Sequence, residues 1–261
     1  MPQPPTRAVD RALDILWCFS EEEPNLTLTQ ISKRVGMHKS TVYRLLATLE
    51  KKRFVQRLDD ASYRLGLGLV ELGFSVLKNN DIHRQALPYM QRLAAECNEN
   101  VDLGILDGTE VLYLQVIESQ QRVKIASAPG QRLPVFCTAT GKAFLAFLPD
   151  KQAQTILKSD HRKYTEYTTT LISEIHKQLQ LTRERGFAVS EQEYEEGISA
   201  VAAPVLDANQ YPIAAMAVVG PAFRLELPRL LELGRILHKT TDALARDVGL
   251  KLQFSKSQLE V

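Results

Sequence analysis

Near the start of the chain, apolar residues recur every three or four positions, which is the spacing of helices that bury one face. Three such segments follow one another at 6–19, 27–36 and 37–52. Thr27 is placed to cap the second helix and Gly36 to end it. Because only a short glycine-containing turn separates the second and third helices, the pattern predicts a helix-turn-helix. The side chains expected to face its core are Val9, Ala12, Leu13, Leu16, Leu28, Ile31, Val35, Val42, Leu45, Leu46 and Leu49.

Alternation of apolar and polar residues replaces the helical spacing after the third helix. Residues 54–58 and 62–65 are predicted to form two short strands around an Asp-Asp-Ala turn. A hairpin in this place is the wing of a winged helix-turn-helix domain, and we assign residues 1–66 to that domain.

A further helix is predicted directly after the wing, and its apolar stripe lies far from both predicted cores. A weak point follows it, in the Asn-Asn-Asp sequence at 79–81. We expect either a second copy of the chain to cover the stripe, which predicts a homodimer, or the second domain of the same chain. Residues 67–80 are assigned as this linker helix and residues 81–261 as the second domain. The stripe consists of Leu67, Val70, Phe74 and Leu77.

In the second domain the pattern mixes strands and helices. Strands are predicted at 101–106, 111–118, 122–128, 187–190, 198–207 and 212–220. Helices are predicted at 83–98, 140–148, 150–157, 173–185 and 227–248. The last two strands flank Ala-Asn-Gln-Tyr and are expected to pair as a hairpin. Strands joined by hairpins, with helices before and after them, predict an antiparallel sheet in an α+β domain.

The composition of the chain is typical of a soluble protein with two domains. Of its 261 residues, 44% are hydrophobic and 24% are charged. No apolar run is long enough to span a bilayer, and the first residues lack the apolar segment of a signal peptide. Cys18, Cys97 and Cys137 lie far apart, which favours neither a disulfide framework nor a clustered zinc site. We therefore expect a cytoplasmic protein with no membrane contact, no metal and no other cofactor.

Basic residues are concentrated in one segment, although the net charge of the whole chain is only +1. Residues 33–64 contain three acidic side chains, Glu50, Asp59 and Asp60, against nine basic ones. A local basic patch of this kind indicates contact with nucleic acid. The nine basic residues are Lys33, Arg34, Lys39, Arg44, Lys51, Lys52, Arg53, Arg57 and Arg64.

The outer side of the third helix carries hydroxyl and basic side chains and almost no carboxylate. In a helix-turn-helix this second helix lies in the major groove of double-stranded DNA. The side chains expected to reach base edges or phosphates are Ser40, Thr41, Tyr43 and Arg44, of which Arg44 is the best candidate to read a guanine. Contacts mainly to phosphates are expected from Lys33, Arg34, Lys39, Arg57 and Arg64. Thr27 is also included among the residues expected to bind DNA. The alternative is a winged helix that contacts protein.

The order of motifs resembles that of a known family. The winged helix is followed by YRLGLGLVELG at 63–73, CTATGKAFLAFL at 137–148 and EYEEGISAVAAPVLD at 193–207. With these motifs, nearly the whole chain is similar to the IclR-type bacterial transcriptional regulators. The resemblance implies a GAF-like effector-binding domain at 81–261, dimers that often pair into tetramers, an operator in double-stranded DNA and a small organic acid as effector. We expect a repressor more than an activator.

A candidate effector site lies where Thr138 to Gly141 begin a predicted helix. The free N–H groups and the dipole of a helix N-terminus favour an anion, here at Ala139, Thr140 and Gly141. Strand alternation places Ile198 and Ala200 on one side of their strand, and the same holds for Ala217 and Val219 on the partner strand. These features suit an amphipathic carboxylate, unless the segment is an ordinary helix start without a ligand.

The resemblance implies that backbone groups of Ala139 and Thr140 hold the carboxylate. It also implies that the side chains lining the remainder are Ser190, Ala200, Ala217 and Val219. The small-acid binders of the family tend to have one Asp, one Cys and two Ser at these four positions, whereas three of the four are apolar here. A site without those polar groups cannot repay the desolvation of a polar ligand. We therefore predict an aromatic or otherwise apolar carboxylate, or no effector at all.

Two further features offer enzymatic chemistry. Glu191, Glu193, Glu195 and Glu196 form a short acidic segment that suits acid–base catalysis, although a solvated loop explains it as well. Cys137 precedes a helix N-terminus, where its pKa would fall, unless it is a buried apolar filler. The alternative function is therefore a thiol- or carboxylate-based enzyme or redox sensor that carries a winged helix. We expect a ligand-responsive transcription factor and no enzyme.

Overall fold

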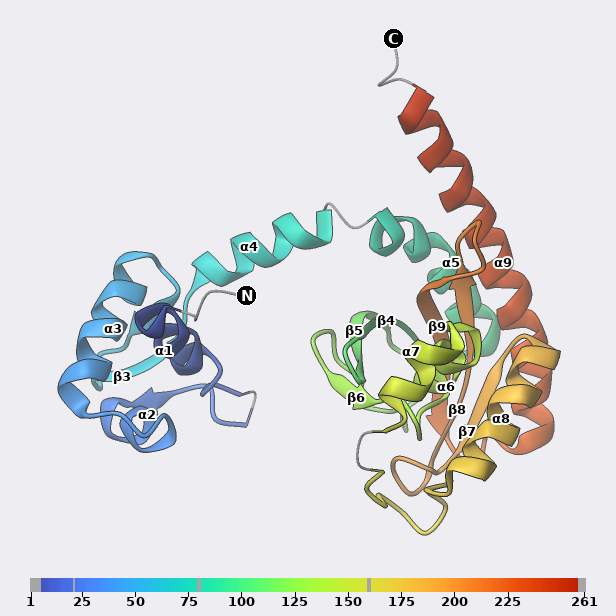
Figure 1. The fold of residues 1–261 in the computed structure, drawn as a ribbon, viewed down its shortest axis with the longest axis horizontal. Helices are drawn as coiled ribbons and strands as arrows, with labels where there is room; N and C mark the ends of the chain where they lie inside the picture. The colour runs from blue at the N-terminus through green and yellow to red at the C-terminus, as the bar shows by residue number, and fades with distance from the viewer. Residues whose placement is uncertain (1–5, 21, 79–80, 159–160, 258–261) are drawn as a thin grey trace. The chain divides into compact units, whose positions relative to one another are not determined.

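A computed structural model of the chain describes residues 6–20, 22–78, 81–158 and 161–257 (Figure 1). The chain divides into two compact units, at Met1–Asn79 and Asn80–Val261. The predicted break at Asn79 and Asn80 lies outside the described residues.

The first unit is a winged helix-turn-helix, as the sequence predicts. It contains α1 (Arg7–Leu16), α2 (Leu28–Arg34) and α3 (Lys39–Lys51) around a three-stranded sheet. The sheet has the order β1-β3-β2, with β1 at Leu26–Thr27, β3 at Ser62–Leu65 and β2 at Val55–Arg57. β1 has only two residues, too few for alternation, so the sequence gives no signal for it. The core consists of Ile15, Leu26, Ile31, Val42, Leu46, Leu49, Val55 and Tyr63.

The expected orientation of α1 is wrong for two residues. Val9 and Leu13 are 57% and 50% exposed, whereas Ile15, which the prediction left out, is fully buried. Ala12 and Leu16 pack against the same core as Ile15. This short helix therefore has two apolar sides, and one of them, with Val9, Leu13 and Trp17 at four-residue spacing, remains exposed.

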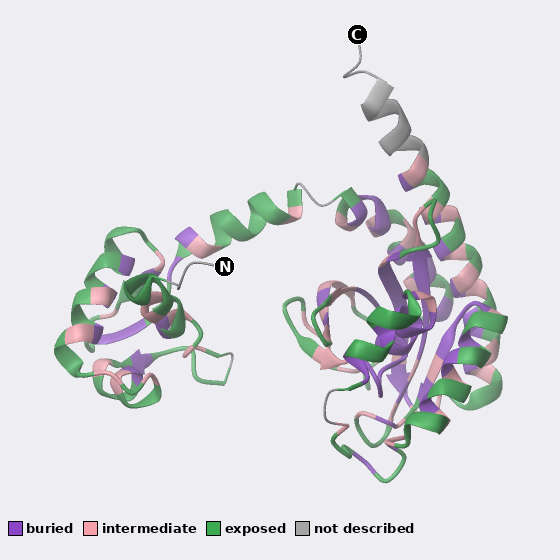
Figure 2. Ribbon diagram, in the orientation of Figure 1, coloured by how far each residue is buried: buried purple, intermediate pink, exposed green. Residues whose placement is uncertain are grey.

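Helix α4 (Leu67–Lys78) follows the wing where the linker helix is predicted. Figure 2 shows it almost entirely exposed. Leu77 of the expected stripe is half-buried, while the other three members of the stripe are exposed. The exposed large apolar side chains of this helix are Leu67, Val70, Leu72, Phe74 and Val76.

The second unit is built on a six-stranded sheet in which all neighbouring strands are antiparallel. Its order is β6 (Arg132–Pro134), β5 (Glu110–Ile117), β4 (Asn100–Asp107), β9 (Pro212–Pro221), β8 (Ile198–Leu206) and β7 (Ala188–Glu191). Helices α5 (Asp81–Cys97) and α9 (Leu227–Ser257) cover one face, and α6 (Ala139–Phe147), α7 (Asp150–Ile156) and α8 (Ile172–Arg185) cover the other. The α+β prediction is confirmed, as is the hairpin of β8 and β9.

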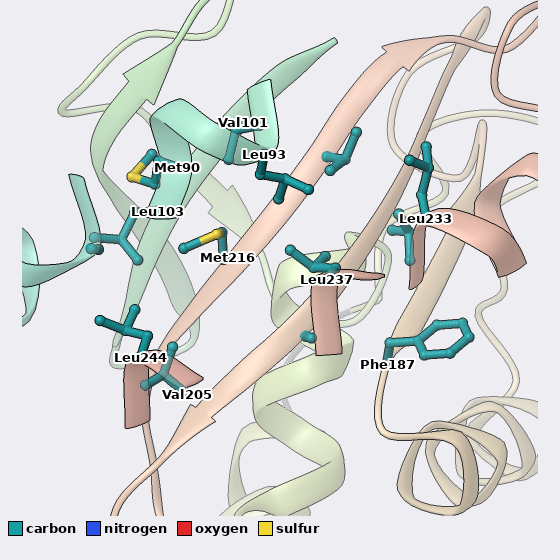
Figure 3. Packing of buried hydrophobic residues seen from close by; sticks show 14 of the residues in the cluster. Met90, Leu93, Val101, Leu103, Phe187, Val205, Met216, Leu233, Leu237 and Leu244 are labelled. Carbon is teal, nitrogen blue, oxygen red and sulfur yellow. The ribbon is translucent and has the colours of Figure 1, made fainter. Parts of the chain in front are cut away.

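Two hydrophobic cores hold these layers together, one on each face of the sheet. Figure 3 shows the first core, where Leu103 of β4 and Met216 of β9 lie beside Met90 of α5 and Leu237 of α9. Because side chains alternate along a strand, the neighbour Ala217 faces the other core. The central strands β4, β9 and β8 therefore carry apolar side chains on both faces, which places the sheet at the centre of the unit.

The strand predicted at 122–128 is wrong, because this segment is a loop. Its backbone is held by side chains instead of by a neighbouring strand. The carbonyl of Ile125 accepts a hydrogen bond from Asn100 Nδ2 at 2.8 Å, and that of Val123 accepts one from Arg224 at 2.9 Å. The segment therefore joins no strand, and part of it forms a wall of the cavity described below.

Candidate DNA-binding face and effector pocket

The third helix presents to solvent the side that the sequence predicts. Val42 and Leu46 are fully buried, whereas Ser40, Tyr43 and Arg44 are exposed, with Tyr43 50% exposed. Thr41 of the predicted contact set is half-buried. Because the exposed residues share one side of α3, they are able to contact a groove together.

Capping contacts fix where the two helices of the motif begin. Thr27 and Gln30 form a capping box on α2: the Gln30 N–H donates to Thr27 Oγ1 at 3.3 Å, and the Thr27 N–H donates to Gln30 Oε1 at 2.8 Å. On α3 the cap is His38, whose Nδ1 accepts from the Ser40 N–H at 3.3 Å. Nδ1 also lies 2.9 Å from Ser40 Oγ, so this hydroxyl has a partner in the free protein. The use of His38 as a cap was not predicted.

The predicted phosphate contacts fall into two groups. Lys33, Lys39 and Arg57 are exposed, and no carboxylate of the described ranges pairs with them or with Arg44. By contrast, Arg34 forms an ion pair with Glu23 and donates to the carbonyl of Cys18 at 2.7 Å. On the wing, Arg64 donates twice to Gln56, at 3.1 and 2.9 Å. Arg34 and Arg64 therefore already serve contacts within the domain.

A cavity in the second unit lies at the N-terminus of α6. It contains about 620 Å³ of space between its atoms, including the part that opens to solvent. Strands β4, β5, β8 and β9 form its floor, and the loop at 125–131 forms one wall. The lining residues are Asp102, Tyr113, Ile125, Ala126, Ser127, Gln131, Leu133, Thr138, Ala139, Thr140, Ser190, Tyr194, Glu195, Ile198, Ala200 and Val219.

Six of the eight predicted effector residues line this cavity: Ala139, Thr140, Ser190, Ile198, Ala200 and Val219. The other two, Gly141 and Ala217, do not. The Gly141 N–H donates to Thr138 Oγ1 at 3.1 Å, and a Cβ on Gly141 would lie 2.2 Å from backbone atoms of Val135. Glycine is therefore needed there for close packing. Ala217 is fully buried, and in the sheet it pairs with Ala202 of β8 and Asp102 of β4.

The N-terminus of α6 leaves two backbone donors free at the cavity. Thr138 caps the helix and takes the N–H of Gly141, and its carbonyl takes the N–H of Lys142 at 2.9 Å. In the described part of the chain, no atom accepts a hydrogen bond from the N–H groups of Ala139 and Thr140. Both residues line the cavity, so these two N–H groups are available to donate hydrogen bonds to an anion.

The cavity has a polar wall that the sequence analysis missed. The Tyr113 hydroxyl donates to Thr140 Oγ1 at 3.1 Å. Asp102 on β4 is buried beside it, and burial raises the pKa of Asp102 to about 7, although a hydrogen bond from Ser127 opposes the rise. The available signal was a single Asp within the otherwise apolar strand VDLGIL. The floor is apolar as expected, but the cavity as a whole is not.

Cys137 does not have the environment of a reactive thiol. It is fully buried, and burial, followed by the nearby charge of Glu193, raises its pKa to about 12. The lowered pKa considered from the sequence is therefore wrong, because burial outweighs the helix dipole. The carbonyl of Cys137 accepts a hydrogen bond from Ser190 Oγ at 2.9 Å, which ties the start of α6 to strand β7.

The acidic segment is not a fully solvated loop either. Glu193 forms a buried ion pair with Lys142 of α6, and Lys142 Nζ also donates to Gln178 Oε1 at 3.0 Å. Burial raises the pKa of Glu193 and lowers that of Lys142, while the attraction between the two charges opposes both shifts. The next two residues, Tyr194 and Glu195, line the cavity, so this ion pair positions part of its wall.

Comparison with known families identifies the chain. The model of the family described as "Bacterial transcriptional regulator IclR C-terminal" matches residues 74–246, and the model of the IclR helix-turn-helix domain matches residues 8–59. The chain belongs to the IclR family of bacterial transcriptional regulators. As an IclR-family member it is a DNA-binding transcriptional regulator.

Two curated relatives span nearly the whole chain. The HTH-type transcriptional regulator XynR of Escherichia coli is 35% identical over 250 residues, which cover 94% of this chain and 98% of XynR. The transcriptional repressor IclR of Escherichia coli is 28% identical, with 93% and 90% covered.

Two solved structures share the fold. An IclR-type regulator from Alicyclobacillus acidocaldarius superposes with a TM-score of 0.83 at 28% identity and covers 93% of this chain and 99% of its own. An IclR homolog from Microbacterium hydrocarbonoxydans, complexed with 4-hydroxybenzoate, gives a TM-score of 0.82 at 22% identity and covers 92% and 99%. The fold of this chain is therefore that of the IclR regulators.

Among the ranges that the structure describes, no helix is long and apolar enough to cross a membrane. In those ranges, no three side chains of His, Cys, Asp or Glu gather as metal ligands would.

Proposed function

We propose that this regulator represses transcription from a DNA operator and that a small carboxylate controls its affinity for that operator. In this proposal residues 1–66 bind DNA, residues 67–80 link the domains, and residues 81–261 bind the effector in the cytoplasm. The observation that carries the effector site is the pair of free N–H groups on Ala139 and Thr140, which face a cavity with an apolar floor. The E. coli repressor among the relatives supports repression over activation.

On the DNA, α3 is the recognition helix. Arg44 is exposed without an ion-pair partner in the described chain, so its guanidinium is available to read a guanine through two hydrogen bonds. Lys33, Lys39 and Arg57 supply phosphate contacts, which set affinity and register. Arg34 and Arg64 contribute less, because DNA would have to compete with their contacts inside the domain.

Two copies of the chain form the DNA-binding unit. The exposed side of α1 and the exposed side chains of α4 leave an apolar surface in the first unit, including Leu13, Trp17 and Phe74. Removing apolar surface from water contributes about 25 cal/mol per Å², so a second copy that covers these side chains is stabilising. A two-fold dimer presents two recognition helices to half-sites about 34 Å apart. Pairing of dimers would give a homotetramer.

The effector is a carboxylate with a largely apolar body. Its carboxylate accepts hydrogen bonds from the N–H groups of Ala139 and Thr140, and its body lies on Ile198, Ala200 and Val219. The Microbacterium relative holds a ligand of this kind, 4-hydroxybenzoate, in the same fold. Glyoxylate has no alkyl group and pyruvate has a single methyl, so these acids gain little from an apolar floor.

A thermal unfolding series on the full chain tests the effector site. Benzoate and hexanoate at about 100 times their Kd should raise the free energy of unfolding by about 3 kcal/mol, and glyoxylate and pyruvate should not. The variant Ala139→Pro should lose most of this gain, because proline removes one of the two donors. Proline suits this first helical position, and Thr138 before it already has the extended backbone that a following proline requires, with ψ of 147°.

A matched proline variant controls for effects on folding. Ile172 is the first residue of α8, and Leu171 before it also has an extended backbone, with ψ of 119°. Ile172→Pro should therefore keep the full response to benzoate. An equal response in Ala139→Pro and wild type would contradict the helix-end site, and no response of the wild type to any of the four acids would contradict a carboxylate effector.

A further inference from the structure

One polar side chain of the cavity has unused hydrogen-bonding capacity in the interior of the protein. Asp102 lies on β4, which is one of the two central strands of the sheet, and its neighbours Val101 and Leu103 are fully buried apolar residues. Only 2% of the Asp102 surface is exposed, and that residue lines the cavity. A carboxyl group in such a place costs free energy unless its oxygens are hydrogen-bonded.

The partners of Asp102 are incomplete. Its carboxyl accepts one hydrogen bond, from the side chain of Ser127, and its Oδ1 has no partner among the described residues. Rotation about the Cβ–Cγ bond of Asp is nearly two-fold, so Ser127 can hold either oxygen and leave the other for a ligand. The chain thus maintains a buried acceptor at the wall of its effector cavity.

The two kinds of polar group in the cavity differ in their chemistry. At the start of α6 the free groups are donors, the N–H groups of Ala139 and Thr140. On the sheet the free group is an acceptor, Asp102. The other titratable groups that line the cavity are Tyr113 and Tyr194, which burial keeps neutral, and Glu195. Among the residues that the structure describes, no Lys or Arg lines it.

We propose that Asp102 accepts a hydrogen bond from a hydroxyl group of the effector, so that the effector is a hydroxycarboxylic acid. This inference rests on the proposed carboxylate site and adds a second polar contact to it. The carboxylate binds at the helix N-terminus, and the hydroxyl completes the bonding of Asp102.

Other groups suit this position less well than a hydroxyl. A second carboxylate would lie against the carboxyl groups of Asp102 and Glu195, and no Lys or Arg among the described lining residues would offset the repulsion. An ammonium group would require a fully ionised Asp102, and burial makes that form costly, as the raised pKa of Asp102 also indicates. A neutral hydroxyl donates to Asp102 in either protonation state.

Calorimetric titration of the full chain with matched acids tests the proposal without any variant. The probes are benzoate, its 2-, 3- and 4-hydroxy derivatives, and the three fluorobenzoates, which resemble the hydroxy acids in size but lack the donor. We expect at least one hydroxybenzoate to bind about ten-fold or more tightly than benzoate and than its own fluoro analogue. Equal affinities for the hydroxy, fluoro and unsubstituted acids would overturn the proposal and leave the carboxylate site standing.

Two variants locate the effect on Asp102. In Asp102→Ala the ratio of affinities for the preferred hydroxybenzoate and benzoate should fall to about one, while benzoate itself still binds. Asp102→Asn keeps an acceptor oxygen in the same shape and should retain part of the preference. An unchanged ratio in both variants would overturn the assignment to Asp102.

Two further outcomes separate the possible failures. Tighter binding of 4-(aminomethyl)benzoate than of every hydroxybenzoate would overturn the proposal, because Asp102 would then act as a counter-ion. No heat with benzoate, the hydroxybenzoates, hexanoate, glyoxylate or pyruvate would instead overturn the carboxylate site itself, and the assignment of Asp102 with it.

Discussion

Helices α3 and α6 each carry one of the two proposed binding sites, but α3 exposes side chains to its ligand and α6 exposes backbone N–H groups. α3 buries Val42 and Leu46 and exposes Tyr43 and Arg44, so the groups that we propose to contact DNA lie along one side. α6 is buried on all sides from Ala139 to Ala146, so only its N-terminal N–H groups reach a ligand. Binding along a helix side follows the period of 3.6 residues, whereas binding at a helix end depends on the elements around that end.

The two regions also differ in how they hold charge. On the DNA-binding face the cations are exposed, and the ion pair of Arg53 and Glu71 nearby has both side chains more than 60% exposed. Such pairs contribute little to stability. Beside the effector cavity, Lys142 and Glu193 are 1% and 8% exposed, so neither charge has water as an alternative partner. In the first region the exposed charges of Lys33, Lys39 and Arg57 are therefore available to DNA, whereas the paired charges of the second region are structural.

The largest expected effect concerns this buried ion pair. Glu193→Ala should lower the free energy of unfolding by about 3–5 kcal/mol, because it leaves the Lys142 ammonium buried without a counter-charge. Replacing both residues by apolar ones of similar size, Lys142→Met with Glu193→Leu, should restore most of the loss. Urea unfolding measures both. If Glu193→Ala lowers the free energy of unfolding by less than about 1 kcal/mol, the buried ion pair contributes no more than an exposed one, and the two regions do not differ in this respect.

The pH dependence of stability tests the burial of Asp102. Its folded-state pKa of about 7 lies above the unfolded value, so the folded state binds the proton more tightly. The wild type should therefore lose stability as the pH rises from 4 to 7, and Asp102→Asn should not lose this part. The difference in free energy of unfolding between the two should change in favour of the variant by up to about 4 kcal/mol between pH 4 and pH 8. A constant difference over this range would mean that Asp102 is solvated.

The variant Arg44→Ala tests whether the exposed side of α3 reads bases of the DNA. We expect the affinity for an operator selected from random DNA to fall by about 1–3 kcal/mol, with relaxed preference at one base pair, since a bidentate contact to guanine is lost. The matched variant is Arg34→Ala, whose guanidinium pairs with Glu23, and it should change DNA affinity much less. Gel-shift titrations with operator and scrambled DNA measure both. An equal loss in the two variants would contradict the assignment of Arg44 to base reading.

The smallest effect is expected for a phosphate contact. Lys33→Ala should weaken binding to all DNA sequences by a similar factor and lower the slope of log affinity against log salt concentration by about one. Titrations at several salt concentrations give this slope, with Arg57→Ala as a second example from the wing. A loss confined to the operator would place Lys33 at a base edge instead.

Local patterns were enough for much of the fold. The apolar spacing of residues 39–51 predicted both the buried and the exposed side of α3, since a helix has the same geometry in any protein. The short Ala-Asn-Gln-Tyr connection predicted the pairing of β8 and β9, and strand alternation predicted the side chains that share a face, such as Ile198 and Ala200. The capping role of Thr27 also followed from the sequence, because a cap needs only residues three positions apart.

The wrong predictions concern features that depend on contacts between distant parts of the chain. Val9 and Leu13 were expected inside, but α1 has a second apolar side with Ile15, and only the packing shows which of the two meets the core. Residues 122–128 have the composition of a strand, yet side chains from Asn100 and Arg224 take up their backbone groups. Neither choice is visible within a window of ten or fifteen residues.

Local sequence patterns were sufficient to predict two domains, the outer side of α3 with Arg44, and a helix start with free N–H groups at Ala139 and Thr140. These features arise from local periodicity and capping, which act over one or two helical turns. By contrast, the shared burial of Lys142 and Glu193 and the position of Asp102 in the cavity wall follow from contacts between distant parts of the chain. Burial, and with it the cost of a charge or an unpaired oxygen, is set by residues far apart in the chain.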